Sequence, residues 1–476
     1  MLDTMSRMMI HRICAALIAA CLIFHPAFAQ EREAQADELM AAWSKGDGPG
    51  AAVLVIRDGR VLLKKGYGLS NIKTGEAVKA STIFDLASVS KQFTAMGVML
   101  LAGQKKLTLD DSLAKFFPEF PPYAKEITVR HLLQHTSGIA DYPRLLIATG
   151  KIKAGWQRET AAAFQPTSKD VIALLAAQKA LDFSPGERWA YSNSNYVLLA
   201  GIIERASGKS FQQFLKDNIF QPLGMQHTFV YQPANPLGQK RAARYERAAT
   251  GYRAIESTPF DLIYGDGNVH STLDDLYKWS QALSGERLLK ADDMRQIFSP
   301  GRLKNGSLTD YGFGWVLDKY FGLRTAYHQG GGTGFNTYIM RVPDENFTVV
   351  VLSNYARFNP FITGRRLARL YLADKLTLPV PVEVAPQVLE KYVGSYRLSS
   401  LTAMDIRLDK GVLRAEAQGQ KPLKLLPLSE TKFFVEGEED TIITFRLDAG
   451  GEVRGITVLQ VDIATSGKKI DASAKD

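Results

Sequence analysis

A proline-rich segment divides this chain into two parts with different patterns of secondary structure. Residues 376–386 contain three prolines and no helical period, which predicts a stiff, extended linker. Before it, helical patterns alternate with strands and with loops rich in glycine and proline. After it, short strand-like runs alternate with turns such as Asp409–Gly411. Residues 387–463 are therefore expected to form a small antiparallel β-barrel or meander, and the polar tail 464–476 to be disordered.

The length and composition place the chain among globular proteins of more than one domain. Its 476 residues are too many for one ordinary core. It is 46% hydrophobic and 22% charged, with a net charge of +9, and its basic residues form no run longer than a pair. Nucleic-acid binding normally needs clustered Lys and Arg, so we expect a solvated, slightly basic surface instead.

Residues 1–29 have the three parts of a secretory signal peptide. Basic residues precede an apolar stretch at Ile13–Phe24, and Ala27–Ala29 forms a small-residue cleavage site. We expect export to the periplasm or secretion, with lipid anchoring through Cys21 as the alternative. The two cysteines, Cys14 and Cys21, both lie in this segment. The mature chain would therefore have no thiol for a disulfide, a metal site or a nucleophile.

The strongest local signal for chemistry is the sequence Ser88-Val89-Ser90-Lys91. The apolar residues from Val89 to Leu101 cover most of a helix surface, which predicts a buried helix. A serine in its first turn has an unpaired backbone N–H at the positive end of the helix dipole. Lys91 lies on the same face as Ser88, and burial would favour its neutral, proton-accepting form. The alternative is a helix cap followed by a surface lysine.

Two further stretches contain residues that could line an active site. Tyr191-Ser192-Asn193 precedes an apolar helix, so the tyrosine and the amide can point into one cleft. The alternative is a buried tyrosine with a capping asparagine. The glycine-rich stretch His328–Gly334 opens a strand, where glycine lets a backbone approach a ligand closely. The alternative there is a flexible loop or a bulge.

Together and in this order, the three stretches resemble the serine β-lactamase and penicillin-binding-protein superfamily, in particular its branch of class C β-lactamases, D-aminopeptidases and esterases. The resemblance covers residues 36–375 and includes Ile127–Gly138, Phe183–Glu187 and Gly265–Thr272. It implies an α+β fold in which an antiparallel sheet has flanking helices and an all-helical insertion. The Ser88 helix would lie between these parts, and the small β domain would follow.

The resemblance also implies a role for each matching residue. Ser88 would attack a carbonyl and form an acyl-enzyme. Lys91 would hydrogen-bond both Ser88 and Tyr191, and Tyr191 would act as the general base. Asn193 would hold the acyl amide of the substrate. The backbone N–H groups of Ser88 and Gly331 would form the oxyanion hole.

One position departs from the β-lactamase pattern. Where those enzymes have Lys-Thr-Gly, this chain has His328-Gln329-Gly330, and substrate binding is expected at His328 and Gly330. Lysine is a permanent cation suited to a substrate carboxylate, whereas histidine titrates near neutrality and is a weaker anchor. Efficient β-lactam hydrolysis is therefore not expected.

We thus expect an exported serine hydrolase that cleaves an ester or a small peptide amide, including one that contains a D-residue. A β-lactamase and a penicillin- or peptidoglycan-peptide-binding protein without turnover are the alternatives. His131 and His135 have the spacing of metal-binding helices, but no carboxylate accompanies them and they match a structural segment of the family. No metal or cofactor is implied. The expected partner is a small-molecule or short-peptide substrate, with no nucleic acid and no membrane span.

Overall fold

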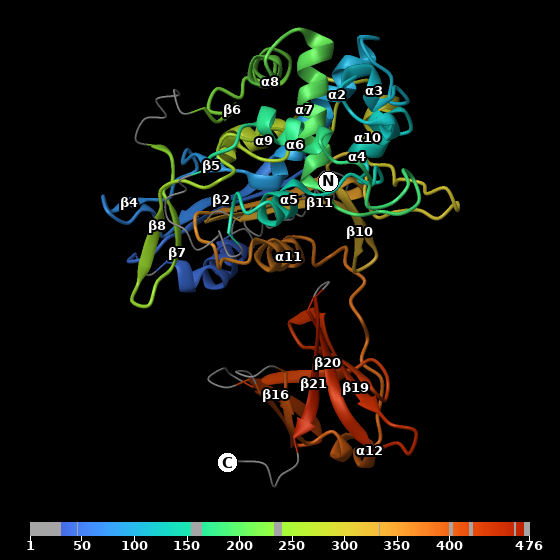
Figure 1. Cartoon of the computed structure of the whole chain (residues 1–476). Coiled ribbons are helices and arrows are strands. Elements are labelled where there is room, and N and C mark those ends of the chain that lie inside the picture. The colour runs from blue at the N-terminus through green and yellow to red at the C-terminus, as the bar shows by residue number, and fades with distance from the viewer. Residues whose placement is uncertain are drawn as a thin grey trace, which may run out of the picture. The chain divides into compact units, whose positions relative to one another are not determined.

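The computed structural model shows two compact units, the first ending at Asp374 and the second beginning at Lys375 (Figure 1). The structure describes residues 30–44, 46–153, 164–232, 240–332, 334–398, 403–417, 422–460 and 463–470. The signal segment predicted for residues 1–29 lies outside this set. In the described part of the chain, no helix has both the length and the apolar character needed to cross a membrane.

The first unit is built on one six-stranded sheet in which every neighbouring pair is antiparallel. The strand order is β10-β11-β12-β13-β1-β2, so strands from both ends of the unit meet where β1 pairs with β13. The strands are β1 (Ala51–Arg57), β2 (Arg60–Tyr67), β10 (Val316–Tyr320), β11 (Leu323–Gly332), β12 (Phe335–Val342) and β13 (Phe347–Ser353).

Helices cover the sheet, because its central strands are apolar at successive positions rather than at alternate ones. Six of the seven residues of β1 and all seven of β13 are buried, which requires cover on both faces. Helix α11 (Pro360–Tyr371) packs on β12 and β13, and α9 (Leu273–Leu283) packs on β1 and β13 (Figure 1). The predicted antiparallel sheet with flanking helices is confirmed.

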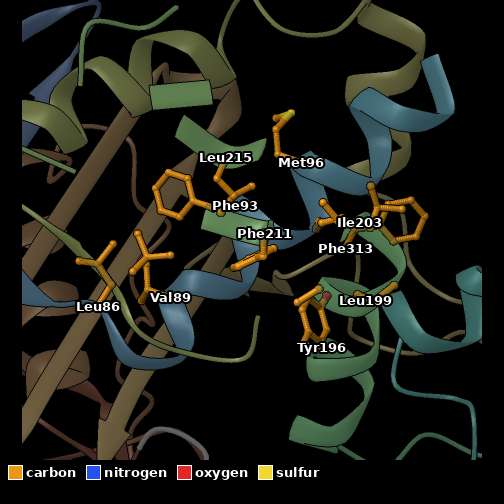
Figure 2. Packing of buried hydrophobic residues seen from close by; sticks show 14 of the residues in the cluster. Leu86, Val89, Phe93, Met96, Tyr196, Leu199, Ile203, Phe211, Leu215 and Phe313 are labelled. Carbon is orange, nitrogen blue, oxygen red and sulfur yellow. The ribbon is translucent and has the colours of Figure 1, made fainter. Parts of the chain in front are cut away.

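The helical insertion lies in sequence between the short strands β5 (Phe84–Asp85) and β6 (Phe229–Val230). Its central helix α2 buries side chains on nearly every face, as its apolar sequence predicts (Figure 2). Helix α2 packs against α7 and α8. The helices are η2 (Ala87–Ser90), α2 (Lys91–Gly103), α3 (Leu113–Phe116), η3 (Pro122–Lys125), α4 (Val129–Leu133), α5 (Tyr142–Ala148), α6 (Ser168–Ala176), α7 (Asn193–Ser207), α8 (Phe211–Leu215) and η5 (Lys216–Phe220).

Short elements connect the insertion to the main sheet. Strand β9 (Val269–Ser271) pairs with both β5 and β6 in a three-stranded sheet. Strand β5 leads directly into η2 and α2, so this small sheet fixes the turn that contains Ser88. The remaining elements of the unit are η1 (Ala41–Trp43), β3 (Leu69–Asn71), β4 (Glu76–Ala77), β7 (Arg244–Arg247), β8 (Tyr252–Ile255), α10 (Ala291–Ile297) and η7 (Pro343–Glu345).

The second unit is a closed barrel of eight strands, which confirms the predicted antiparallel β domain. Each strand pairs with the next, and β14 pairs with β21 to close the barrel. Its core includes Tyr392, whose ring stacks on Phe445 at 4.0 Å between centroids. The elements are α12 (Pro386–Lys391), β14 (Gly394–Arg397), β15 (Ala403–Asp409), β16 (Val412–Ala417), β17 (Leu423–Pro427), β18 (Lys432–Val435), β19 (Glu438–Leu447), β20 (Val453–Gln460) and β21 (Ile463–Ile470).

The predicted disordered tail is wrong over most of its length. Residues 464–470 belong to β21, which pairs with β20 on one side and with β14 on the other. Closing the barrel gives backbone partners to a strand whose polar side chains gave no apolar signal. Residues 376–385 of the predicted linker form no helix or strand, and the Val382 N–H donates to the Pro427 carbonyl at 2.9 Å.

Candidate active site

Ser88 lies in a sharp turn that is stabilised by the carboxylate of Asp85. It sits in the 3-10 helix η2, directly before α2, and is partly exposed. The preceding Ala87 has a φ of 47°, a left-handed conformation that is costly for a residue with a Cβ. The Ala87 N–H donates to Asp85 Oδ1 at 2.8 Å and stabilises this turn. The strained geometry therefore presents the Ser88 hydroxyl at the surface of the unit.

Lys91 is completely buried and joins three segments of the chain through its amine. Its Nζ donates to Ser88 Oγ at 3.1 Å, to Asn193 Oδ1 at 2.9 Å and to the Asp266 carbonyl at 2.8 Å. These three acceptors match the three N–H donors of an ammonium group. Because Ser88 Oγ accepts from Lys91, its own O–H remains available to a base.

Tyr191 lies beside Lys91 but in a different geometry from the one expected. Lys91 Nζ is 5.0 Å from the centroid of the Tyr191 ring, and no hydrogen bond from Lys91 to the Tyr191 hydroxyl is formed among the described residues. The physical reason is that all three amine donors already have acceptors. The tyrosine ring packs against His135, at 4.4 Å between centroids, and lies 6.2 Å from His328.

His135 supports the segment that carries Tyr191 and Asn193. Its Nδ1 accepts hydrogen bonds from the Ser192 N–H at 3.2 Å and from Asn195 Nδ2 at 3.1 Å. Burial, together with the charge of Lys91, lowers the pKa of His135 well below its usual value, so the ring is neutral. In the sequence His135 appeared only as one half of a histidine pair. No local signal showed that it would meet a segment 57 residues away.

His131, the other member of the pair, has a separate local role. Its Nδ1 accepts the Thr128 N–H at 3.2 Å, while Thr128 Oγ1 accepts the His131 N–H, so the two residues form a capping box for α4. Over the residues that the structure describes, no cluster of three or more His, Cys, Asp or Glu side chains could hold a metal ion.

His328 is buried near the Tyr191 ring. Its pKa differs from the value near neutrality that the sequence analysis expected. Only 3% of His328 is exposed. Its Nδ1 donates to the Gln329 carbonyl at 2.7 Å, and its Nε2 accepts from the Tyr311 hydroxyl at 2.9 Å. Burial, with a smaller contribution from the charge of Lys91, lowers the pKa of His328 to about 3. The ring is therefore a neutral partner of Tyr311, a residue that the sequence analysis missed.

Gly330 brings strand β11 against the turn that contains Ser88. A Cβ at this position would lie 2.4 Å from the Leu86 carbonyl oxygen and 2.4 Å from Thr337 Oγ1. Gly330 is buried, whereas the next residue, Gly331, is exposed beside Ser88. Gly330 therefore allows a close approach of two backbone segments, and its substrate contact stays a prediction.

A pocket of about 260 Å³ opens beside Ser88. Ser88, Asn193 and Gly331 all line it, so the structure brings together three of the predicted site residues, with Lys91 buried directly behind them. The full lining consists of Asp85, Ala87, Ser88, Tyr142, Pro143, Asn193, Thr258, Phe260, Asp261, Ile263, Asp266, Gly267, Asn268, Gly331 and Gly332.

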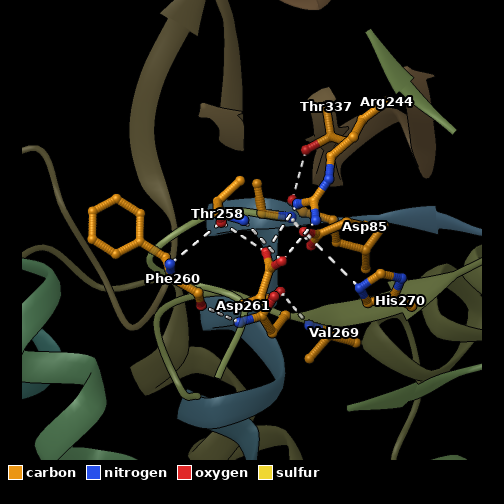
Figure 3. Close-up of polar contacts among 12 residues, drawn as sticks. Asp85, Arg244, Thr258, Phe260, Asp261, Val269, His270 and Thr337 are labelled. Atoms are coloured by element: carbon orange, nitrogen blue, oxygen red, sulfur yellow. Dashed lines mark hydrogen bonds and ion pairs between the residues drawn. The ribbon is translucent and has the colours of Figure 1, made fainter. Parts of the chain in front are cut away.

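One wall of the pocket contains a buried ion pair (Figure 3). Arg244 donates to both oxygens of Asp261, at 2.9 and 2.7 Å, and Asp261 also accepts from Thr258. This two-pronged geometry offsets the cost of removing both charges from water. Close by, Asp85 Oδ2 lies 4.0 Å from His270 Nε2. Burial raises the pKa of Asp85.

Comparison with known proteins identifies the hydrolase unit. The family described as "Beta-lactamase" matches residues 30–373. The chain belongs to the beta-lactamase family. The barrel of this beta-lactamase-family chain matches a second family, "Domain of unknown function (DUF3471)", over residues 378–473.

Relatives of this beta-lactamase-family chain agree with the assignment. The chain is 35% identical over 413 residues to penicillin-binding protein 4* of Bacillus subtilis (strain 168), covering 80% of this chain and 87% of that protein. It is 29% identical over 314 residues to a D-aminopeptidase of Brucella anthropi, covering 65% of this chain and 56% of that protein. The octameric penicillin-binding protein homologue from Pyrococcus abyssi superposes with a TM-score of 0.64 at 25% identity, covering 92% of this chain and 99% of that one. The resemblance seen in the sequence is confirmed, and the chain is a beta-lactamase-family serine hydrolase.

Proposed function

We propose that this chain is an exported hydrolase that cleaves amide or ester bonds in small acyl substrates, including those of D-residues, through an acyl-enzyme on Ser88. The observation that carries the proposal is the arrangement around Lys91. Its amine holds Ser88 and Asn193 together at the edge of an open pocket. A binding protein without turnover has no need of this combination of groups.

The proposed reaction has two steps. Ser88 Oγ attacks the substrate carbonyl carbon, and its proton passes to the phenolate oxygen of Tyr191. The negative charge on the carbonyl oxygen is stabilised by the backbone N–H groups of Ser88 and Gly331. The bond to the leaving group breaks and Tyr191 returns the proton to it. Water then attacks the acyl-enzyme, and Tyr191 transfers the water proton to Ser88 Oγ.

The pocket and the relatives both favour a small substrate. A volume of about 260 Å³ accommodates a short acyl group, and relatives of this chain include proteins named D-aminopeptidase. His328 is neutral and enclosed, so it offers no permanent cation for the carboxylate of a β-lactam. We therefore place β-lactam hydrolysis second to amide or ester hydrolysis.

The test compares initial rates on a short-chain nitrophenyl ester, a D-alanyl nitroanilide and a chromogenic cephalosporin. We expect turnover of the ester or the nitroanilide, and we expect Ser88→Ala to lower that rate by about 10⁴-fold or more, as loss of a nucleophile does in other serine hydrolases. Ser112→Ala is the matched control, because the Ser112 hydroxyl makes no capping bond to α3 and does not line the pocket. Wild-type protein that turns over none of the three substrates, or a Ser88→Ala variant that keeps the rate, would contradict the proposal.

A further inference from the structure

Asp266 lines the pocket, and another residue binds its carboxyl group through one oxygen. Its Oδ2 accepts from the Tyr142 hydroxyl at 2.9 Å. Its Oδ1 accepts no hydrogen bond from another residue in the part of the chain that the structure describes. Burial, acting with the charges of Asp266 and Asp141, raises the pKa of Tyr142 well above its usual value. The Tyr142 hydroxyl is therefore a permanent donor that orients the carboxylate.

The backbone of the segment that carries Asp266 is fixed against α2. Thr94 Oγ1 donates to the Gly265 carbonyl at 2.7 Å, and the Val269 N–H donates to Ser90 Oγ at 3.0 Å. Between these bonds, Lys91 Nζ donates to the Asp266 carbonyl at 2.8 Å. Because the same amine contacts Ser88 Oγ, Asp266 is separated from the nucleophile by a single bridging group.

The other carboxylates near the pocket already have partners. Asp261 is paired with Arg244, Asp85 accepts the Ala87 N–H, and Asp141 accepts the Asn193 N–H at 2.7 Å. Asp266 forms no salt bridge with Lys91, which contacts its backbone carbonyl instead. The charge of Asp85 is also offset by Arg244 and Arg241, whereas the cation acting on Asp266 is Lys91. Among the described pocket-lining carboxylates, Asp266 is therefore the one positioned to accept a cation from a ligand.

The charge on Asp266 is only partly compensated in the free protein. Burial raises the pKa of Asp266 to about 6, against the opposing effects of Lys91 and the Tyr142 hydrogen bond, while Asp141 raises it further. A buried carboxylate of this kind gains free energy when a cationic group enters the pocket and pairs with it.

We propose that Asp266, oriented by Tyr142, selects substrates that carry a free ammonium group next to the scissile carbonyl, such as an unacylated amino-acid amide or the N-terminal residue of a peptide. We assign the position next to the carbonyl because Ser88 and Asp266 line the same pocket and both accept from Lys91 Nζ, Ser88 through Oγ and Asp266 through its backbone carbonyl. Pro143, Phe260 and Ile263 provide an apolar lining for the side chain of that residue. This inference rests on the proposed hydrolase function.

The test measures kcat/KM for D-alanyl p-nitroanilide and for its N-acetyl derivative in wild type and in Asp266→Asn. We expect wild type to prefer the free amine, and Asp266→Asn to reduce the ratio of the two values by about 10- to 100-fold, the usual effect of a charge-assisted hydrogen bond. Any general effect of the substitution on Lys91 affects both substrates and cancels in the ratio. An unchanged ratio, or a wild type that prefers the acetylated substrate, overturns the inference while leaving the proposed hydrolase function intact.

Tyr142→Phe provides the matched variant. It removes the hydroxyl but keeps the carboxylate, so the preference for the free amine is expected to remain. The acid limb of kcat/KM for that substrate, near pH 6 in wild type, should move to higher pH because the lost donor stabilised the charged carboxylate. A limb that stays in place in Tyr142→Phe contradicts the assignment of that titration to Asp266.

A calorimetric measurement separates this inference from the proposed function. D-alanine amide and N-acetyl-D-alanine amide are titrated into Ser88→Ala and into Ser88→Ala combined with Asp266→Asn. We expect the second substitution to weaken binding of the free amine by about tenfold or more and to leave the acetylated compound little affected. If wild type hydrolyses nothing, the proposed function fails, and this binding comparison still decides the role of Asp266.

Discussion

At the scale of single residues, the active centre is organised by neutral histidines. His135 packs on the Tyr191 ring and accepts the Ser192 N–H, and His328 accepts the hydroxyl of Tyr311. Both rings are buried, and burial lowers the pKa of each. A charged ring at either position would add a cation beside Lys91. The neutral rings instead hold Tyr191 close to the amine without repelling it.

The buried His328 makes stability dependent on pH. Its pKa is about 3 in the folded protein and near 6.5 when unfolded. Between these values the unfolded state binds more protons, so this contribution is complete above about pH 6.5 and is lost as the pH falls toward 3. We expect the free energy of unfolding, measured with urea at pH 7.5 and pH 5, to fall less in His328→Gln than in wild type, by up to about 2 kcal/mol. Equal decreases in the two proteins would show that His328 is not the neutral group described.

At the scale of elements, the site depends on how closely strand β11 approaches η2. Thr337 Oγ1, on the neighbouring strand β12, donates to the Leu86 carbonyl at 2.7 Å, and Gly330 leaves room for this contact. The approach places Gly331 beside Ser88 along one wall of the pocket. The hairpin of β1 and β2, by contrast, depends on its own turn residues. Its Asp58-Gly59 turn has φ values of 51° and 74°, as a two-residue hairpin requires.

Gly330→Ala tests this approach. The added methyl would meet backbone and side-chain oxygens at 2.4 Å, so we expect a loss of about 1–3 kcal/mol in the free energy of unfolding together with loss of hydrolysis. Gly103→Ala is the control, because a Cβ at this end of α2 meets nothing within 4 Å. It should be neutral or stabilising by up to about 1 kcal/mol. Chemical denaturation of the two variants side by side makes the comparison, and similar stability losses would refute the explanation.

At the scale of the whole molecule, the chain is two units with separate cores. The first core gathers side chains from the main sheet and the helical insertion, from Ala52 to Leu352. The second lies inside the barrel and runs from Leu389 to Ile456. Among the described residues, every strand pairs only with strands of its own unit. Both parts therefore meet the physical requirements of an independent folding unit.

Independent folding of the two units is directly testable. A chain that ends at Asp374 and a chain that begins at Lys375 are each expected to unfold cooperatively when heated, as followed by circular dichroism. A chain cut after Val342 is the control, because it lacks β13 and so removes the strand between β12 and β1. That chain should not fold. If either separate unit is unfolded while the full chain is folded, the units are not autonomous.

The sequence by itself determined the features that depend on short spacing. The Ser88–Lys91 pair, the buried helix after it and the division into two parts follow from local patterns. The pair, taken with the Tyr191–Asn193 and His328–Gly334 stretches, carried the resemblance to the family and its fold. Only the tertiary structure decided what surrounds these residues. Lys91 meets Asn193 102 positions away and Asp266 175 positions away, and β21 closes the barrel by pairing with β14 as well as with β20. Such contacts depend on how distant segments pack, and no local periodicity in the sequence records that packing.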